Sequence, residues 1–122
     1  MSHILVIDDD DFFIELLVQL LQQDGHRVTT ADDGVKAMKL LQRIKPDLII
    51  TDILMPNMDG VELIMELSQQ SNDTPLIAMS GGRRSVTSEF NLQSAKLMGV
   101  KETLTKPFSQ ADLRRAIQKA LV

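Results

Sequence analysis

Short apolar runs alternate with longer amphipathic stretches along this chain of 122 residues. A short run of apolar or β-branched residues with polar residues on both sides is typical of a buried strand. Such runs predict strands at His3 to Ile7, Arg27 to Ala31, Leu48 to Thr51, Leu76 to Met79 and Thr103 to Thr105. The first run is the clearest, because it leads directly into four consecutive Asp residues.

Apolar residues at helical spacing fill the intervals between these strands. They predict helices at Asp11 to Asp24, Gly34 to Arg43, Gly60 to Gln69, Thr87 to Met98 and Ser109 to Leu121. The expected inward positions are Phe13, Leu17, Leu20 and Leu21 in the first helix, Val35, Met38 and Leu41 in the second, and Leu113, Ala116, Ile117, Ala120 and Leu121 in the last. Asp10 or Asp11 is expected to cap the first helix, and Gly25 is expected to end it.

Strands that alternate with helices of this length predict an α/β fold, in which helices cover both faces of a parallel sheet. Right-handed crossovers are expected between its strands. The length suits one domain over residues 1–122, without room for a second domain.

Composition excludes several classes of protein. The net charge of -4 and the pI near 5.0 argue against non-specific nucleic-acid binding. The absence of Cys excludes a disulfide framework and thiol chemistry. No apolar run approaches the ~20 residues that cross a bilayer, and no signal peptide is visible. A cytoplasmic protein without a membrane partner is therefore expected.

Chemically reactive side chains stand where four of the predicted strands end. Asp8 and Asp9 follow the first strand, Asp52 the third, Ser80 the fourth and Lys106 the fifth. These strand ends meet at one edge of a parallel sheet, where ligands bind. Clustered carboxylates repel one another unless a cation neutralises them or the site is well solvated, so the pattern suggests a divalent-cation site, most simply for Mg²⁺. A carboxylate beside a metal, a lysine and a hydroxyl can accept a phosphoryl group.

Each of these residues also has an ordinary structural explanation. An Asp at a strand end often forms a turn or a cap, and a lone lysine is usually a solvated surface residue. Their joint placement at four strand ends is what favours a functional interpretation.

Four motifs strengthen the functional interpretation of these residues. They are IDDD from Ile7 to Asp10, IITDILMPNMDG from Ile49 to Gly60, MS at Met79-Ser80 and LTKPF from Leu104 to Phe108. In their order and spacing, the chain resembles the receiver domain of two-component response regulators over essentially its whole length. The resemblance implies a flavodoxin-like, doubly wound (βα)5 fold in three layers, with strand order 2-1-3-4-5. It also implies a cis peptide bond between Lys106 and Pro107.

The resemblance further implies a role for each site residue. The implied catalytic residues are Asp52, Ser80 and Lys106, and the implied metal ligands are Asp8, Asp9, Asp52 and the backbone carbonyl of Leu54. Asp52 would accept the phosphoryl group, with Mg²⁺ as cofactor. The donor would be a phosphohistidine on a sensor histidine kinase or a histidine phosphotransfer protein.

Phosphorylation would change the face formed by the fourth strand, the fourth helix and the fifth strand. That face would control a downstream protein partner or an output domain. The chain would catalyse only its own phosphorylation and dephosphorylation, as a monomer or weak dimer, without direct contact to nucleic acid. Whether it stands alone or belongs to a longer regulator is left open.

Two features depart from the family pattern. Thr103 occupies the position where many members have Tyr or Phe, so an aromatic switch is not expected there. Ser80 and Lys106 are further apart than usual, with the excess around Gly81 to Phe90. This excess is either a tolerated surface insertion or a functional segment, which would be a partner contact or a gate over the phosphorylation site that uses Arg83 or Arg84.

Three other classes compete with this interpretation. A phosphotransferase or phosphatase with an Asp nucleophile usually has a second acid–base Asp close behind, where this chain has Leu54. A flavin-binding domain needs a hydroxyl- and glycine-rich loop after its first strand, where four Asp residues stand here. A phosphorylation-independent interaction module would not require the intact set of Asp8, Asp9, Asp52 and Lys106.

Overall fold

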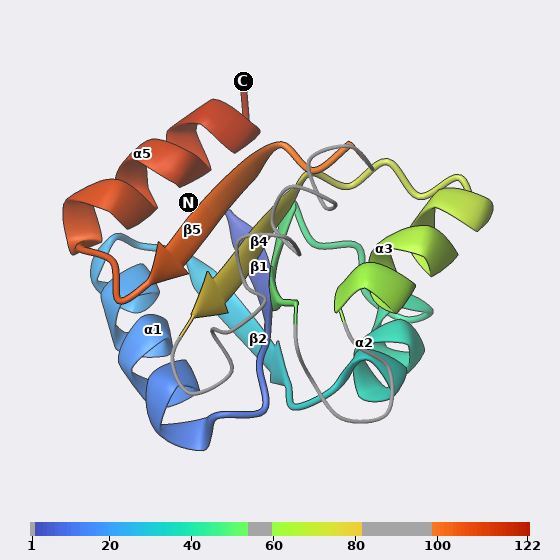
Figure 1. The fold of residues 1–122 in the computed structure, drawn as a ribbon, viewed down its shortest axis with the longest axis horizontal. Coiled ribbons are helices and arrows are strands. Elements are labelled where there is room, and N and C mark those ends of the chain that lie inside the picture. The colour runs from blue at the N-terminus through green and yellow to red at the C-terminus, as the bar shows by residue number, and fades with distance from the viewer. Residues whose placement is uncertain (1, 54–59, 82–98) are drawn as a thin grey trace.

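The structure is a computed structural model that describes residues 2–53, 60–81 and 99–122. Within these ranges five parallel strands form one sheet in the order β2-β1-β3-β4-β5 (Figure 1). The strands are β1 (His3–Ile7), β2 (Arg27–Ala31), β3 (Leu48–Asp52), β4 (Leu76–Gly81) and β5 (Glu102–Lys106). The helices are α1 (Asp11–Gln23), α2 (Gly34–Leu41), α3 (Gly60–Gln69) and α5 (Gln110–Ala120).

Helices cover both faces of the sheet, so the predicted three-layer α/β fold is confirmed. Helices α1 and α5 lie on one face, and α2 and α3 lie on the other (Figure 1). Successive residues of a strand point to opposite faces. Ile4 and Val6 accordingly pack under α1 and α5, whereas Leu5 and Ile7 pack under α2 and α3. A central strand that is apolar on both sides is typical of a parallel sheet with two helical layers.

The caps explain where the helices begin. The side chain of Asp10 accepts a hydrogen bond from the Phe13 N–H at 3.1 Å, so Asp10 is the cap of α1. Ser109 and Asp112 form a reciprocal capping box at the start of α5. Gly25 follows α1 with φ of 85°, the left-handed conformation expected of a glycine that ends a helix.

Most predicted elements are confirmed, and the differences have local causes. Helix α2 ends at Leu41 rather than Arg43. Val35 was expected to face inward but is 39% exposed, because the cap at Asp33 sets a helical phase in which Ala37 faces the sheet. Leu121 was also expected to face inward but is exposed, because it follows the last turn of α5.

Strands β4 and β5 are longer than predicted, since their pairing continues to Gly81 and Lys106. The expected cis bond between Lys106 and Pro107 is present. The predicted helix from Thr87 to Met98 lies outside the described residues. Among the helices that the structure describes, none is long and apolar enough to cross a membrane.

Candidate functional site

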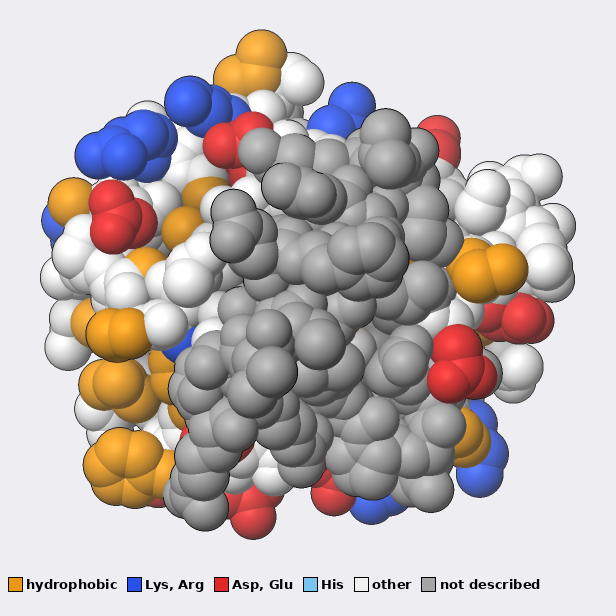
Figure 2. All heavy atoms as spheres, in the orientation of Figure 1, with side chains coloured by type: hydrophobic (Ala, Val, Ile, Leu, Met, Phe, Trp, Pro, Cys, Tyr) orange, Lys and Arg blue, Asp and Glu red, His pale blue; other side chains and the backbone are white. Residues whose placement is uncertain are grey.

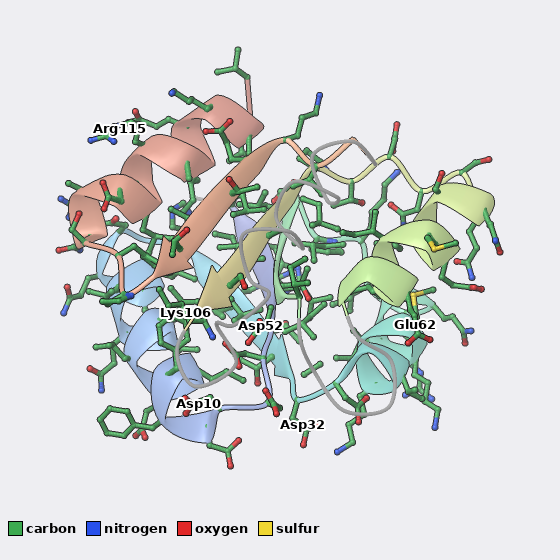
Figure 3. All side chains as sticks on the ribbon, viewed as in Figure 1. Asp10, Asp32, Asp52, Glu62, Lys106 and Arg115 are labelled. Carbon is green, nitrogen blue, oxygen red and sulfur yellow. The ribbon has the colours of Figure 1, made fainter. Side chains whose placement is uncertain are left out.

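The candidate site lies at the carboxyl edge of the sheet. Asp8 and Asp9 follow β1, Asp52 ends β3 and Lys106 ends β5. Ser80 stands one residue before the end of β4 and pairs with Thr105. Figure 3 shows the side chains of Asp52 and Lys106 next to each other at this edge. The sheet therefore brings together the residues that the sequence predicted to converge.

Lys106 bridges two of the carboxylates. Its Nζ lies 2.6 Å from Oδ2 of Asp8 and 3.0 Å from Oδ2 of Asp52. Asp8 is fully buried, and the Lys106 side chain is only 10% exposed. Charge-assisted hydrogen bonds of this kind strengthen when water is excluded. They hold the ammonium group directly beside the carboxylate of Asp52.

The three carboxylates form a compact group. Oxygens of Asp8, Asp9 and Asp52 all lie within 4.8 Å of one another, the one such group found among the described residues. Three carboxylates together with one ammonium carry an excess of negative charge. Carboxylate oxygens are the ligands that hard divalent cations prefer. The donor set therefore fits a bound Mg²⁺ or a similar cation.

The pKa values of this cluster reflect burial opposed by charge. Burial raises the pKa of Asp8 to about 6, and the charge of Asp52 adds to this rise. The hydrogen bonds from Lys106 and from the backbone N–H of Asp10 act in the other direction. Burial by itself lowers the pKa of Lys106, but the bond to Asp8 and the charges of both carboxylates raise it above its usual value. The fold thus keeps Lys106 charged and makes ionisation of Asp8 less favourable than in water.

Ser80 contributes a hydroxyl group whose hydrogen bonding is incomplete. It is 1% exposed, and within the described part of the chain its Oγ has no hydrogen-bond partner. A buried polar group without a partner is unfavourable, and native structures usually supply one. The Oγ is therefore available to a ligand at this edge, such as an oxygen of an added anion.

Two aromatic rings adjoin the site. The Phe13 ring centroid lies 4.2 Å from Nζ of Lys106, and the Phe13 and Phe108 rings meet edge to face at 5.7 Å. The sequence predicted Phe13 only as a core position of the first helix. Its place two residues after the last Asp of the acidic run is the signal that would have associated it with the site.

Some predicted site residues cannot be placed. Leu54, Arg83 and Arg84 lie outside the described residues, so the proposed carbonyl ligand and gate stay predictions. Thr103, at the position that is often aromatic, is half-buried in β5 and pairs with Ala78.

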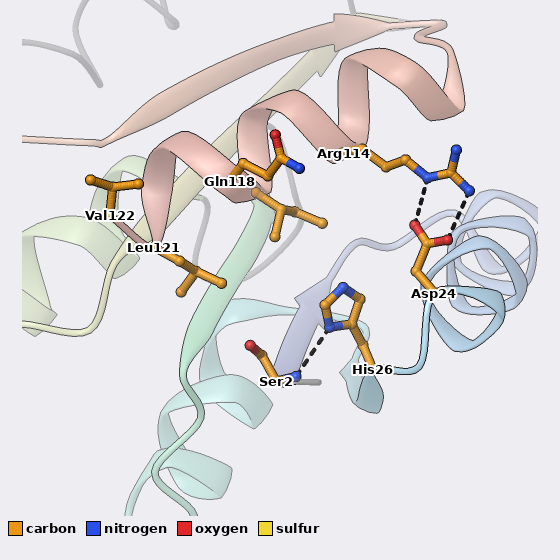
Figure 4. A pocket seen from close by; sticks show the side chains of 8 residues that line it. Ser2, Asp24, His26, Arg114, Gln118, Leu121 and Val122 are labelled. Atoms are coloured by element: carbon orange, nitrogen blue, oxygen red, sulfur yellow. Dashed lines mark hydrogen bonds and ion pairs between the residues drawn. The ribbon is translucent and has the colours of Figure 1, made fainter.

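A separate cavity of about 590 Å³ lies at the opposite, amino edge of the sheet, between the end of α1 and α5 (Figure 4). Here Arg114 donates two hydrogen bonds to Asp24, at 2.9 and 2.8 Å, and His26 Nδ1 accepts one from the Ser2 N–H. None of the carboxyl-edge residues lines this cavity.

Comparison with known proteins identifies the family. The model of the response regulator receiver domain matches residues 4–118. The chain belongs to the response regulator receiver domain family. A receiver domain is a signalling module of two-component systems, as the motifs indicated.

Individual relatives support this assignment. The receiver domain is 33% identical to the alkaline phosphatase synthesis transcriptional regulatory protein PhoP of Bacillus subtilis over 120 residues, which is 98% of this chain and 48% of PhoP. The chain spans about half or less of the length of the first curated relatives it matches.

Solved structures support the fold. The chain superposes on a response regulator receiver domain protein from Clostridium thermocellum with a TM-score of 0.88 and 28% identity, covering 99% of this chain and 94% of that one. It superposes on the chemotaxis response regulator CheY4 of Vibrio cholerae with a TM-score of 0.85 and 32% identity, covering 99% of both. The flavodoxin-like fold with strand order 2-1-3-4-5 is therefore confirmed.

Proposed function

We propose that this receiver domain accepts a phosphoryl group on Asp52 and so acts as a phosphorylation switch. The observation that carries the proposal is the position of Lys106, whose Nζ joins the carboxylates of Asp8 and Asp52 at the carboxyl edge. A carboxylate beside a fixed ammonium is a suitable acceptor, because the added oxygens would be neutralised where they form. We also propose that residues 1–122 make up one such domain.

Mg²⁺ is the proposed cofactor. Asp8, Asp9 and Asp52 would hold it, together with the backbone carbonyl of Leu54. The close approach of the three carboxylates supports this assignment. When bound, Mg²⁺ would neutralise charge on the phosphoryl oxygens during transfer.

The transfer step needs a donor with a labile phosphoryl group. A phosphohistidine of a sensor histidine kinase or a histidine phosphotransfer protein fits this requirement. An oxygen of Asp52 attacks the phosphorus as the N–P bond breaks, and the imidazole leaves with the bonding pair and takes up a proton. Lys106, whose Nζ lies 3.0 Å from Oδ2 of Asp52, would contact the equatorial oxygens. The product is an acyl phosphate on Asp52.

The buried hydroxyl of Ser80 would report the new state. A phosphoryl oxygen on Asp52 supplies the partner that the Ser80 Oγ lacks among the described residues. Ser80 stands near the end of β4, so its movement would affect the segment after β4 and the pairing with β5. The changed face would then bind or release a downstream protein or an output domain. Hydrolysis of the acyl phosphate returns the carboxylate and inorganic phosphate.

This function concerns the chain's own modification, so we propose a switch rather than a turnover enzyme. A monomer or weak dimer is sufficient for it, and it requires neither nucleic acid nor a membrane.

The test is intact mass spectrometry after incubation with acetyl phosphate and Mg²⁺. We expect the gain of one phosphoryl group in the wild type, no gain without Mg²⁺, and no gain in Asp52→Asn. Beryllofluoride, which mimics the acyl phosphate, is the second probe and should perturb the NMR signals of residues around Ser80. A folded wild type that responds to neither probe would contradict the proposal.

A further inference from the structure

We propose that Phe13 is a positioning residue of this site, whose aromatic face holds the ammonium group of Lys106 at the acceptor carboxylate. The inference rests on the proposed role of Asp52. It assigns a function to a residue that the sequence placed only in the core.

The contact between the ring and the ammonium group is direct. Nζ of Lys106 lies 4.2 Å from the ring centroid, inside the limit of about 6 Å for a cation–π interaction. The same Nζ contacts Asp8 and Asp52 through hydrogen bonds. The Lys106 side chain is 10% exposed, so little water reaches the ammonium group. Cation–π attraction is strongest where the cation is desolvated, as it is here.

The ring is fixed by its own neighbours. Phe108 meets Phe13 edge to face, with an interplanar angle of 82°, and so limits the tilt of the ring. The Phe13 N–H donates to Oδ1 of Asp10, and the Asp10 N–H donates to Oδ1 of Asp8. Hydrogen bonds thus connect Asp8 to the start of α1. The Phe13 ring on that helix contacts Lys106 Nζ, which is also bonded to Asp8. The same hydrogen bonds therefore fix the position of the Phe13 ring relative to the Asp8 carboxylate.

An aromatic face suits a cation that has to move. When Asp52 carries a phosphoryl group, Nζ must leave a carboxylate oxygen for a new phosphoryl oxygen. A polar side chain at this position would accept hydrogen bonds from the ammonium group and so compete with the oxygens. A π face attracts the positive charge without accepting a directional hydrogen bond. Nζ can therefore shift across the ring while it keeps this contact. Phe13 would hold Lys106 in place and leave its protons to the oxygens.

Phe12 is a matched control on the same helix. It is 81% exposed. Figure 2 shows hydrophobic side chains on the surface over α1. Replacement of either Phe by Leu removes one ring with little change of volume. The change at position 13 alone removes the ring beside Lys106.

The test compares phosphorylation rates with acetyl phosphate and saturating Mg²⁺, measured by intact mass. We expect Phe13→Leu to react about fivefold more slowly, Phe13→Tyr to react like the wild type, and Phe12→Leu to stay within about twofold. A series with one, two and three fluorines on the ring at position 13 weakens the π face at nearly constant shape. The rate should fall stepwise along this series. A constant rate along the series would overturn the proposal, since Phe13 would then act through packing alone.

A second measurement does not depend on phosphorylation. A ring face so close to Nζ should displace the NMR signal of the Lys106 ε-methylene protons upfield, and Phe13→Leu should abolish this displacement. No difference between the two proteins would overturn the contact itself. A wild type that shows the displacement but never accepts a phosphoryl group would overturn the proposed function, and the positioning role with it, while the contact stands.

Discussion

Two charged clusters at opposite edges of the sheet use the same kinds of residues in different ways. At the carboxyl edge, one buried ammonium bridges Asp8 and Asp52, with Asp9 close by. At the amino edge, the exposed Arg114 pairs with the single carboxylate of Asp24 through two hydrogen bonds. The first cluster has more negative than positive charge, whereas the second is balanced.

The pKa shifts of the two carboxylates express this difference. Burial raises the pKa of Asp8 to about 6, whereas the hydrogen bonds from Arg114 lower the pKa of Asp24. The fold therefore opposes the ionised form of Asp8 and favours the ionised form of Asp24. A site proposed to bind a cation and accept a phosphoryl group is expected to have unbalanced charge without them, and the balanced pair is expected to be structural.

The largest expected effect is the loss of Lys106. Lys106→Met removes the ammonium group beside Asp52, the proposed acceptor, and should slow phosphorylation by acetyl phosphate by at least about a hundredfold. Arg114→Met makes a comparable change at the other cluster and should leave the rate unchanged. Equal rates for Lys106→Met and the wild type would show that Lys106 does not stabilise the transferred group.

Neutralising one carboxylate at each edge should change stability in opposite directions. At neutral pH without Mg²⁺, Asp8→Asn should stabilise the fold by about 2 kcal/mol. The substitution removes a buried carboxylate that is harder to ionise in the folded state, where its pKa is raised to about 6. Asn keeps an oxygen that accepts the hydrogen bond from the Asp10 N–H. Asp24→Asn should destabilise the fold. Urea unfolding of both variants measures the two signs, and a destabilised Asp8→Asn would contradict the account.

The stability changes from Asp8→Asn and Asp24→Asn should depend on pH in different ways. Asp8 binds its proton more tightly in the folded state than in the unfolded state, where its pKa is 3.8. Its contribution to stability is therefore complete below about pH 4 and is lost as the pH rises through about 6. The gain from Asp8→Asn should therefore be absent below about pH 4 and should grow to its full size as the pH rises through about 6. The loss from Asp24→Asn should instead vanish as the pH falls through the depressed folded pKa of Asp24.

Mg²⁺ should stabilise the folded protein by binding the carboxyl-edge cluster, which has excess negative charge, and not the balanced pair of Arg114 and Asp24. At a concentration ten times its dissociation constant, the ion should add about 1.4 kcal/mol to the wild type. Asp9→Asn should reduce this gain, whereas Arg114→Met should preserve it. The gain should also decline as the pH falls below about 6, since protons then compete at Asp8. Thermal unfolding with and without Mg²⁺ tests this, and an equal gain in Asp9→Asn would remove Asp9 from the metal site.

The smallest expected effect is at the exposed pair. Arg114→Met removes both hydrogen bonds to Asp24, but exposed ion pairs contribute little to stability. A slightly lower unfolding midpoint with unchanged Mg²⁺ stabilisation is expected. A loss of stability as large as the gain from Asp8→Asn would mean that the amino-edge pair is more than a local contact between α1 and α5.

The sequence predicted the meeting of Asp8, Asp52 and Lys106 because parallel strands bring their carboxyl ends to one edge. It could not predict that Lys106 bridges two carboxylates or contacts Phe13, because those contacts depend on rotamers and on the entry angle of α1. The inward position assigned to Val35 was wrong for a related reason. In a helix as short as α2, the cap and the packing on the sheet decide which residues face inward.

The most direct test of the central claim locates the phosphoryl group chemically. Borohydride reduces an acyl phosphate of Asp to homoserine, which tandem mass spectrometry then assigns to one residue. After incubation with acetyl phosphate and Mg²⁺, we predict homoserine at position 52, and none in the sample without Mg²⁺. Homoserine at position 8 or 9, or unmodified Asp52 in a protein that has gained the mass of a phosphoryl group, would contradict the account.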